Sequence, residues 1–178
     1  GKDVVLLDSL YQGLEPRVDY LRAKHAIDIP LEVIDIRNYA AVDALLATHS
    51  FTGIIHTAAL KAVGESMSKY EMYWNNNVAS TEKLLAVLAN NEIDKFVFSS
   101  SAAVYGTPES VPVTESMPTL PESVYAETKL AVEKYLGTLA VRAAVHASAG
   151  ATPTPVSTLP DQRGTYAAVA EALRHIPN

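Results

Sequence analysis

The sequence predicts an α/β fold in which a parallel β-sheet is flanked by helices. Three observations lead to this prediction. Short apolar runs rich in β-branched residues alternate with longer segments of helical periodicity. Each run is followed by polar or small residues, and in open α/β sheets the carboxyl ends of the strands are where ligands bind. The chain has 178 residues, of which 48% are hydrophobic, and this is enough for one domain with a core of its own.

The first part of the chain contains two strands, each with a helix after it. Asp3–Leu7 and Leu31–Ile34 are short apolar runs that fit strands buried on both faces of a parallel sheet. Leu14–Lys24 and the segment from about Tyr39 to His49 have helical spacing. This order of elements is the one that the predicted sheet requires.

An acidic residue follows each of these strands. Asp8 stands at the end of the first, where an acid can accept hydrogen bonds from the ribose hydroxyls of a dinucleotide. Asp35 and Ile36 stand at the end of the second. The alternative for Asp8 is that it caps the turn or helix that follows, and the alternative for Asp35 is that it is the N-cap of the helix from about Tyr39, since Asp is favoured at such positions in any case.

The next strand is Gly53–His56, and it leads into Thr57, Ala58, Ala59, Leu60 and Lys61. Small residues at this place let the backbone approach a cofactor closely. The segment Lys69–Asn90 has the apolar spacing of a long helix, but three asparagines at positions 75–77 interrupt it. Asparagine is a poor helix former, so this triplet needs either a binding role or a solvated polar face.

Lys95–Phe98 is the fourth strand, and Ser99, Ser100 and Ser101 follow at its carboxyl end. Thr107–Pro121 contains several prolines and is predicted to be a loop beside the site. The helix from about Val124 then carries Tyr125 and Lys129, which are four positions apart and share one face.

Tyr125, Lys129 and a serine from a strand end form a set that can transfer a proton. The lysine ammonium favours the tyrosinate and is expected to lower the pKa of Tyr125 from its ordinary value of about 10. The Ser101 hydroxyl can hydrogen-bond the alcohol or carbonyl that is interconverted. On the opposite side of the same helix, Leu130, Val132 and Leu136 are candidates for the core or for a helix–helix dimer contact.

Three motifs carry a resemblance to a known family. FSSSAAVYG (Phe98–Gly106), HTAALKAVGES (His56–Ser66) and the Y-x-x-x-K pair resemble the extended short-chain dehydrogenase/reductase family, and within it the UDP-glucose 4-epimerases, over residues 1–136. The resemblance implies a Rossmann-like fold that binds NAD. It also implies epimerisation at C4 of a UDP-sugar (UDP-glucose and UDP-galactose) through a transient 4-keto intermediate, in a homodimer that pairs through the helices Lys69–Asn90 and Val124–Leu136.

The resemblance also implies roles for individual residues. Asp35 and Ile36 would lie along the adenine ring, Asn76 would hydrogen-bond the cofactor, and Lys61 would reach the nicotinamide-side ribose and the sugar. The implied catalytic residues are Ser101, Tyr125 and Lys129, and the implied substrate-binding residues are Lys61, Ser101 and Tyr125. The implied cofactor-binding residues are Asp8, Asp35, Ile36, Thr57, Ala58, Ala59, Lys61, Asn76, Tyr125 and Lys129.

Two parts of the family pattern are missing. The sequence has no G-x-x-G-x-x-G turn to hold a pyrophosphate, so we expect a truncated fold without its first β-α unit. The absent strand would lie between the first and third strands of this chain and would leave two sheet edges unpaired, unless Leu139–Val145 or another chain fills the gap. We divide the sequence into a partial NAD-binding domain (1–150) and a linker with a C-terminal helix (151–178).

Composition excludes several function classes. The chain has no cysteine, its five histidines are scattered, and we expect no metal site. A net charge of −6 argues against nucleic-acid binding, and no apolar run is long enough to span a membrane, so a cytoplasmic protein is expected. The alternatives to the predicted activity are a 4-epimerase for another nucleotide sugar and a degenerate dinucleotide-fold module without catalysis.

Overall fold

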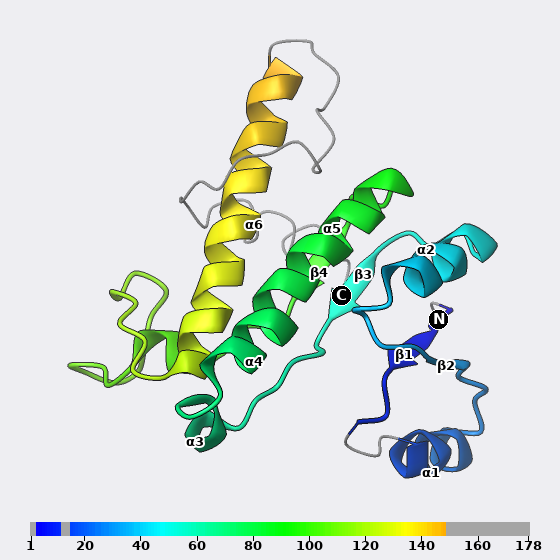
Figure 1. The fold of residues 1–178 in the computed structure, drawn as a ribbon, viewed down its shortest axis with the longest axis horizontal. Helices are drawn as coiled ribbons and strands as arrows, with labels where there is room; N and C mark the ends of the chain where they lie inside the picture. The colour runs from blue at the N-terminus through cyan, green and yellow to red at the C-terminus, as the bar shows by residue number, and fades with distance from the viewer. Residues whose placement is uncertain (1–2, 12–14, 149–178) are drawn as a thin grey trace.

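The computed structural model describes residues 3–11 and 15–148, and in this part of the chain helices alternate with short parallel strands (Figure 1). Figure 1 places β1, β2 and α1 at one end of the molecule and α6 at the other, with α5 between them. The elements are β1 (Leu6–Asp8), α1 (Glu15–His25), β2 (Leu31–Val33), α2 (Tyr39–Thr48), β3 (Ile54–His56), α3 (Val63–Ser66), α4 (Tyr70–Trp74), the π-helical turn η1 (Asn75–Ala79), α5 (Ser80–Asn90), β4 (Phe96–Phe98), the 3₁₀ turn η2 (Ala102–Tyr105) and α6 (Val124–Ser148).

The strands form two separate parallel pairs within the described residues. β1 pairs with β2, with Leu7 opposite Glu32, and β3 pairs with β4, with Ile55 opposite Val97. No ladder joins β1 to β3 in this part of the chain. The break falls at the position where the sequence lacks a strand, and the segment Leu139–Val145 does not fill it.

The strands are covered on one side only, which corrects the prediction that they are buried on both faces. Ile54 and Phe96 pack against the core, whereas Ile55 is 75% exposed and Val33 is 59% exposed. The reason is the helix arrangement. The core cluster lies between α2 and α5, and its fully buried members are Val42, Leu46, Leu84, Leu85 and Leu88.

Helix α6 is longer than the sequence analysis expected. It continues through Leu139–Val145, so the prediction of a further strand there is wrong. Residues 139–148 are mostly alanine and valine with no proline, and nothing local ends a helix that is already propagating. Leu130 and Val132 are buried within the chain and Leu136 packs against the core cluster, so these three side chains belong to the core.

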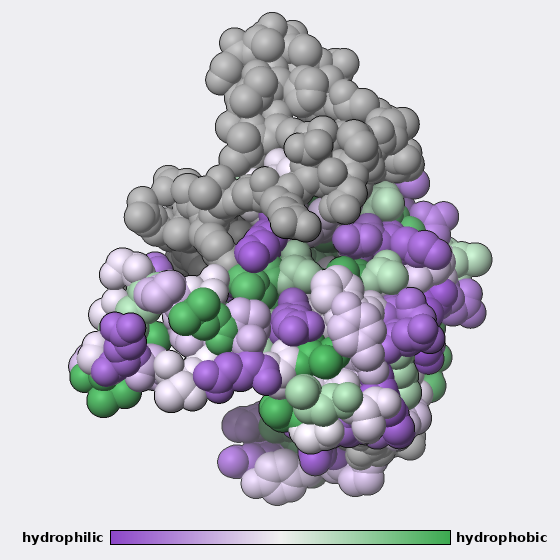
Figure 2. Space-filling view, turned by 60° about the vertical axis from the view of Figure 1, so that its left-hand side comes forward, coloured by the Kyte–Doolittle hydropathy of each residue, from purple (hydrophilic) through white to green (hydrophobic). Residues whose placement is uncertain are grey.

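The long helix predicted over Lys69–Asn90 is a helix with a π-helical turn at the asparagines. α4 and α5 flank η1, which begins at Asn75, and the Ser80 N–H donates to the Asn75 carbonyl five residues earlier. The face of the molecule that Figure 2 shows carries small hydrophobic groups separated by polar ones. No helix among the described residues has both the length and the apolar character that a membrane span requires. The predicted division at residue 150 and the C-terminal helix lie outside the described residues.

Candidate functional site

A cavity of about 510 Å³ lies at the carboxyl ends of β1, β2 and β3. It brings together side chains from the first 76 residues that are far apart in the sequence. Its lining includes Asp8, Asp35, Ile36, Thr57, Ala58, Ala59, Lys61 and Asn76, all of which the sequence analysis named for a cofactor. Ser101, Tyr125 and Lys129 are not among the residues that line it.

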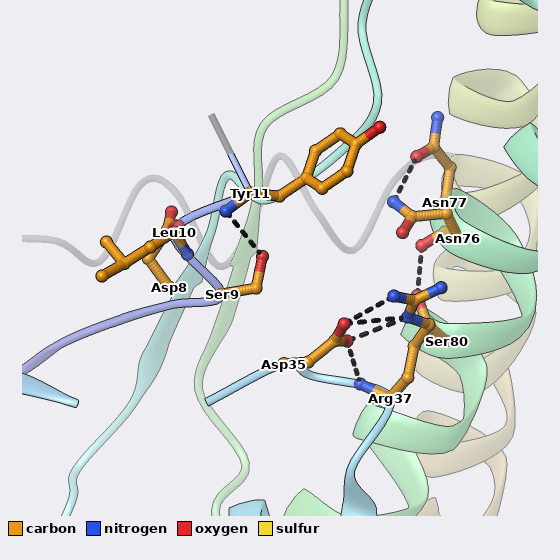
Figure 3. Close-up of polar contacts among 9 residues, drawn as sticks. All are labelled: Asp8, Ser9, Leu10, Tyr11, Asp35, Arg37, Asn76, Asn77 and Ser80. Carbon is orange, nitrogen blue, oxygen red and sulfur yellow. Dashed lines mark hydrogen bonds and ion pairs between the residues drawn. The ribbon is translucent and has the colours of Figure 1, made fainter. Parts of the chain in front are cut away.

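The two acids that line the cavity have different hydrogen-bond partners. The Asp8 carboxylate accepts a hydrogen bond from the Leu10 N–H at 2.7 Å, and so holds the turn after β1. The Asp35 carboxylate faces the Arg37 guanidinium, whose Nη2 donates at 2.6 Å and whose Nε donates at 2.9 Å (Figure 3). This side-chain hydrogen bond from Arg37 holds the pKa of the Asp35 carboxyl below its usual value.

The capping alternative for Asp35 is wrong, because a different residue caps the helix that follows. The Asn38 side chain accepts from the Ala41 N–H at the start of α2. Asp35 instead accepts from the Arg37 N–H two residues on, as in an Asx turn. Ile36 stands between Asp35 and Arg37 and contributes an apolar side chain to the cavity wall.

The opposite wall of the cavity is the segment from Thr57 to Lys61. Both main-chain polar groups of Leu60 bond the Asn77 side chain: the N–H donates to Oδ1 at 2.8 Å, and the carbonyl accepts from Nδ2 at 2.9 Å. Lys61 is exposed at the end of this segment. Asn76 lines the cavity, and its Nδ2 donates to Asn77 Oδ1 at 3.2 Å (Figure 3), so its own carboxamide oxygen takes no part in this bond.

Asn77 has a structural role that the sequence did not predict, since Asn76 was the member of the triplet expected to bind the cofactor. It is 3% exposed, and its Nδ2 also donates to Thr128 Oγ1 on α6 at 3.1 Å. The signal was present in the sequence, since three poor helix formers inside a helix require a compensating interaction. Which of the three is buried could not be read from the sequence, because the π-helical turn changes the direction of each side chain.

Ser66 holds the start of α6, a role that the sequence did not indicate. Its hydroxyl is fully buried, donates to the Val63 carbonyl at 2.6 Å and accepts from the Tyr125 N–H at 3.1 Å. The Tyr125 N–H is one of the first-turn donors that a helix cannot satisfy internally. A residue 59 positions earlier therefore anchors the helix turn that carries Tyr125.

Lys129 is buried beside the end of β4. Its Nζ donates to the Ser99 carbonyl at 2.8 Å, and the ammonium lies 4.7 Å from the centre of the Phe98 ring and 6.0 Å from that of Tyr125. Burial lowers the pKa of Lys129 to about 8. The predicted spacing of Tyr125 and Lys129 on one helix face therefore brings the two side chains together.

The serines end β4 as predicted, but they differ in their hydrogen bonds. Ser101 begins η2, and its Oγ accepts from the Ala103 N–H at 3.2 Å. The buried Ser100 hydroxyl has no hydrogen-bond partner in the described part of the chain. A buried hydroxyl without a partner next to Ser101 leaves a polar group that a ligand can satisfy.

The fold and the site define a class of protein. A parallel sheet flanked by helices, with acids after two adjacent strands and a cavity at the strand ends, belongs to the Rossmann-like α/β proteins. The model of the NAD dependent epimerase/dehydratase family matches residues 1–176, and the chain belongs to this family.

Known proteins that resemble the chain are sugar epimerases. UDP-glucose 4-epimerase 2 of Oryza sativa subsp. japonica is 40% identical over 136 residues, which cover 75% of this chain and 33% of the rice protein. The solved UDP-glucose-4-epimerase of Stenotrophomonas maltophila, with bound NAD and formylated UDP-arabinopyranose, has a TM-score of 0.76 and 34% identity over 79% of this chain and 42% of its own. The UDP-Glc/GlcNAc 4-epimerase of Campylobacter jejuni has a TM-score of 0.70 and 28% identity over 90% of this chain and 51% of its own.

Proposed function

We propose that this chain is the dinucleotide-binding part of an NAD-dependent nucleotide-sugar 4-epimerase that acts on UDP-glucose and UDP-galactose. The observation that carries the proposal is the cavity, which gathers two acids, a small-residue wall and a lysine at the ends of three parallel strands. Since the chain spans 33% of the rice relative, the activity of the whole enzyme extends beyond the residues in hand.

The cavity residues suit the parts of NAD. The Asp8 carboxylate would accept hydrogen bonds from ribose hydroxyls, and Ile36 would offer an apolar surface to a flat ring. Thr57, Ala58 and Ala59 leave room for a close approach of the backbone. When bound, NAD supplies a reversible hydride acceptor.

The protein's own part of the chemistry is proton transfer. The Tyr125 hydroxyl would take the proton of the sugar 4-hydroxyl and return it after the ring has turned over. The Lys129 ammonium, held by the Ser99 carbonyl, would stabilise the tyrosinate. The Ser101 hydroxyl would hydrogen-bond the same sugar oxygen, and Lys61 would bind both ribose and sugar.

The direct test is an assay of UDP-glucose and UDP-galactose interconversion with added NAD. Tyr125→Phe is expected to abolish turnover, whereas Tyr20→Phe, an exposed tyrosine on α1, is expected to leave it unchanged. Absence of turnover at high protein concentration would remove the activity claim for this chain, and equal activity of the two variants would refute the assignment of Tyr125.

A degenerate module without catalysis is the second candidate, because the sequence lacks the glycine-rich turn and the catalytic trio does not line the cavity. Thermal melting separates the two candidates. A ligand that binds only the folded state raises the midpoint, so an unchanged midpoint at millimolar NAD favours the degenerate module.

Assembly and location are further parts of the proposal. We propose a homodimer in the cytoplasm, with the exposed sides of α5 and α6 in contact. Sedimentation equilibrium tests the dimer, and a monomer at every concentration would exclude it. Fractionation of cells that express the tagged full-length protein tests the location.

A further inference from the structure

A buried line of hydrogen bonds begins at His56, the last residue of β3. His56 is 4% exposed and its ring lies against the rings of Phe96 and Phe98. Its Nε2 is 2.9 Å from Thr81 Oγ1, and Thr81 is fully buried on α5. The imidazole therefore has a polar partner in surroundings that are otherwise aromatic and apolar.

The direction of this first hydrogen bond follows from the second. Thr81 Oγ1 is 2.7 Å from the Asn77 carbonyl oxygen, and only the hydroxyl of that pair has a hydrogen to donate. The single hydroxyl proton is thus committed to Asn77, and Thr81 must accept from His56. In the neutral ring of His56 the hydrogen is consequently on Nε2, and Nδ1 carries none.

The same argument fixes the far end of the line. Thr128 Oγ1 is 2.7 Å from the Tyr125 carbonyl and donates to it, so it accepts from Asn77 Nδ2. This fixes the orientation of the Asn77 amide, which leaves Oδ1 to accept from the Leu60 N–H. The donor and the acceptor are then assigned for each hydrogen bond between His56, Thr81, Asn77, Leu60, Thr128 and Tyr125.

The π-helical turn lies at the centre of this network. The hydroxyls of Ser80 and Thr81 donate to the carbonyls of Asn76 and Asn77, each four residues earlier (the Ser80 bond is drawn in Figure 3). A hydroxyl at that position gives the carbonyl of the preceding turn a side-chain partner. The turn in which Asn77 sits is therefore held by Thr81, and Thr81 is held by His56.

We infer that His56 is a positioning residue of the site. As an Nε2–H donor it fixes the Thr81 hydroxyl, which in turn holds the main-chain carbonyl of Asn77. The carboxamide of the same residue holds both Leu60 in the cavity wall and, through Thr128, the α6 turn that carries Tyr125. We call the hydrogen bonds that lead from His56 through Thr81 and Asn77 to Leu60 and Thr128 the relay. The relay joins the cavity to the proton-transfer set, which lies outside the cavity lining. Its effect on NAD and sugar rests on the proposed function; its geometry does not.

The tautomer can be measured in the wild-type chain. Long-range proton–nitrogen NMR correlation on histidine-labelled protein distinguishes the two ring nitrogens, and His56→Phe, which keeps an aromatic ring between Phe96 and Phe98, assigns the signal. A protonated Nε2 and an unprotonated Nδ1 are expected. The opposite tautomer, or rapid averaging of the two, would overturn the inference.

Amide hydrogen exchange tests the relay itself. Thr81→Val keeps the shape of the side chain and removes the hydroxyl, and it is expected to speed exchange of the Leu60 amide about tenfold or more beyond any change in the β3–β4 ladder. Thr81→Ser keeps a hydroxyl and should restore protection. Thr48→Val is the matched control, because Thr48 Oγ1 makes an exposed contact with His49 at 2.8 Å.

The outcomes separate the relay from the proposed function. If the exchange rate of the Leu60 amide in both Thr81 variants changes only as much as their global stability does, the relay is refuted. If the tautomer and the exchange pattern are as expected but no variant and no wild-type protein binds NAD, the relay stands and the proposed function falls. If NAD binds, weaker binding to Thr81→Val than to Thr81→Ser is expected.

Discussion

Lys129 Nζ donates to the main-chain carbonyl of Ser99 at 2.8 Å, and this contact joins α6 to the end of β4 across 30 residues. Lys129 differs from a surface lysine, because its ammonium is buried and lies over the Phe98 ring. This contact brings the helix face that carries Tyr125 and Lys129 against the serine-rich end of β4.

The buried ammonium predicts a dependence of stability on alkaline pH. Burial lowers the Lys129 pKa to about 8 from an unfolded value of 10.5, so between these values the unfolded chain holds a proton that the folded chain has released. The stability of the wild type relative to Lys129→Met is therefore expected to rise by on the order of 2 kcal/mol from about pH 7.5 to about pH 10. Urea unfolding at both pH values measures it.

The control for this prediction is Lys134→Met, which removes an exposed lysine of the same helix. Its stability difference from the wild type should stay constant over the same range. Parallel pH profiles of Lys129→Met and the wild type would contradict the prediction.

His56 predicts a dependence at acidic pH. Burial lowers its pKa from 6.5 to about 4, so as pH falls between these values the unfolded chain takes up a proton before the folded chain does. Stability is thus lost over this window, and the advantage of the wild type over His56→Gln should shrink by on the order of 2 kcal/mol from about pH 7 to about pH 4. Chemical denaturation of both proteins measures the difference, with His49→Gln, an exposed histidine, as the control.

Gly106 predicts a local steric limit at the loop after Ser101. Its φ is +61°, and a Cβ there would lie 2.1 Å from the Leu120 carbonyl oxygen, a backbone atom that can move aside only with its loop. Gly106→Ala is expected to lower the free energy of unfolding by about 2 kcal/mol or more.

Gly64→Ala supplies the comparison, because a Cβ at Gly64 meets nothing within 4 Å. It should change stability by less than about 1 kcal/mol, since alanine is the better helix former. Urea midpoints measure both variants, and equal effects would show that the close approach at Gly106 is relieved by movement of the loop.

Asp8 predicts the strength of cofactor binding. Asp8→Ala removes a charged acceptor from the cavity and is expected to weaken NAD binding roughly tenfold to a hundredfold, since hydrogen bonds to charged groups contribute about 1.5–3 kcal/mol. Asp28→Ala, an exposed acid that does not line the cavity, should bind NAD as the wild type does. Isothermal titration calorimetry measures both, and equal affinities would remove Asp8 from the site.

Local sequence patterns predicted most of the elements. Three of the four strands fall within one residue of their apolar runs, and β1 begins three residues later than predicted. The helices Leu14–Lys24 and Tyr39–His49 match α1 and α2. The acids and small residues after the strands meet in one cavity because the carboxyl ends of parallel strands share an edge. These features depend on periodicity and chain direction, which neighbouring residues encode.

By itself the sequence determined the parallel α/β order, the residues that follow each strand and the shared helix face of Tyr125 and Lys129. Only the tertiary structure decided that Leu139–Val145 continues a helix, that Asn77 and not Asn76 is buried, and that His56 directs the bonds around it. The physical reason is that hydrogen-bond partners such as Asn77 and Thr128 lie 51 residues apart, and a partner at that separation is selected by packing and not by local pattern.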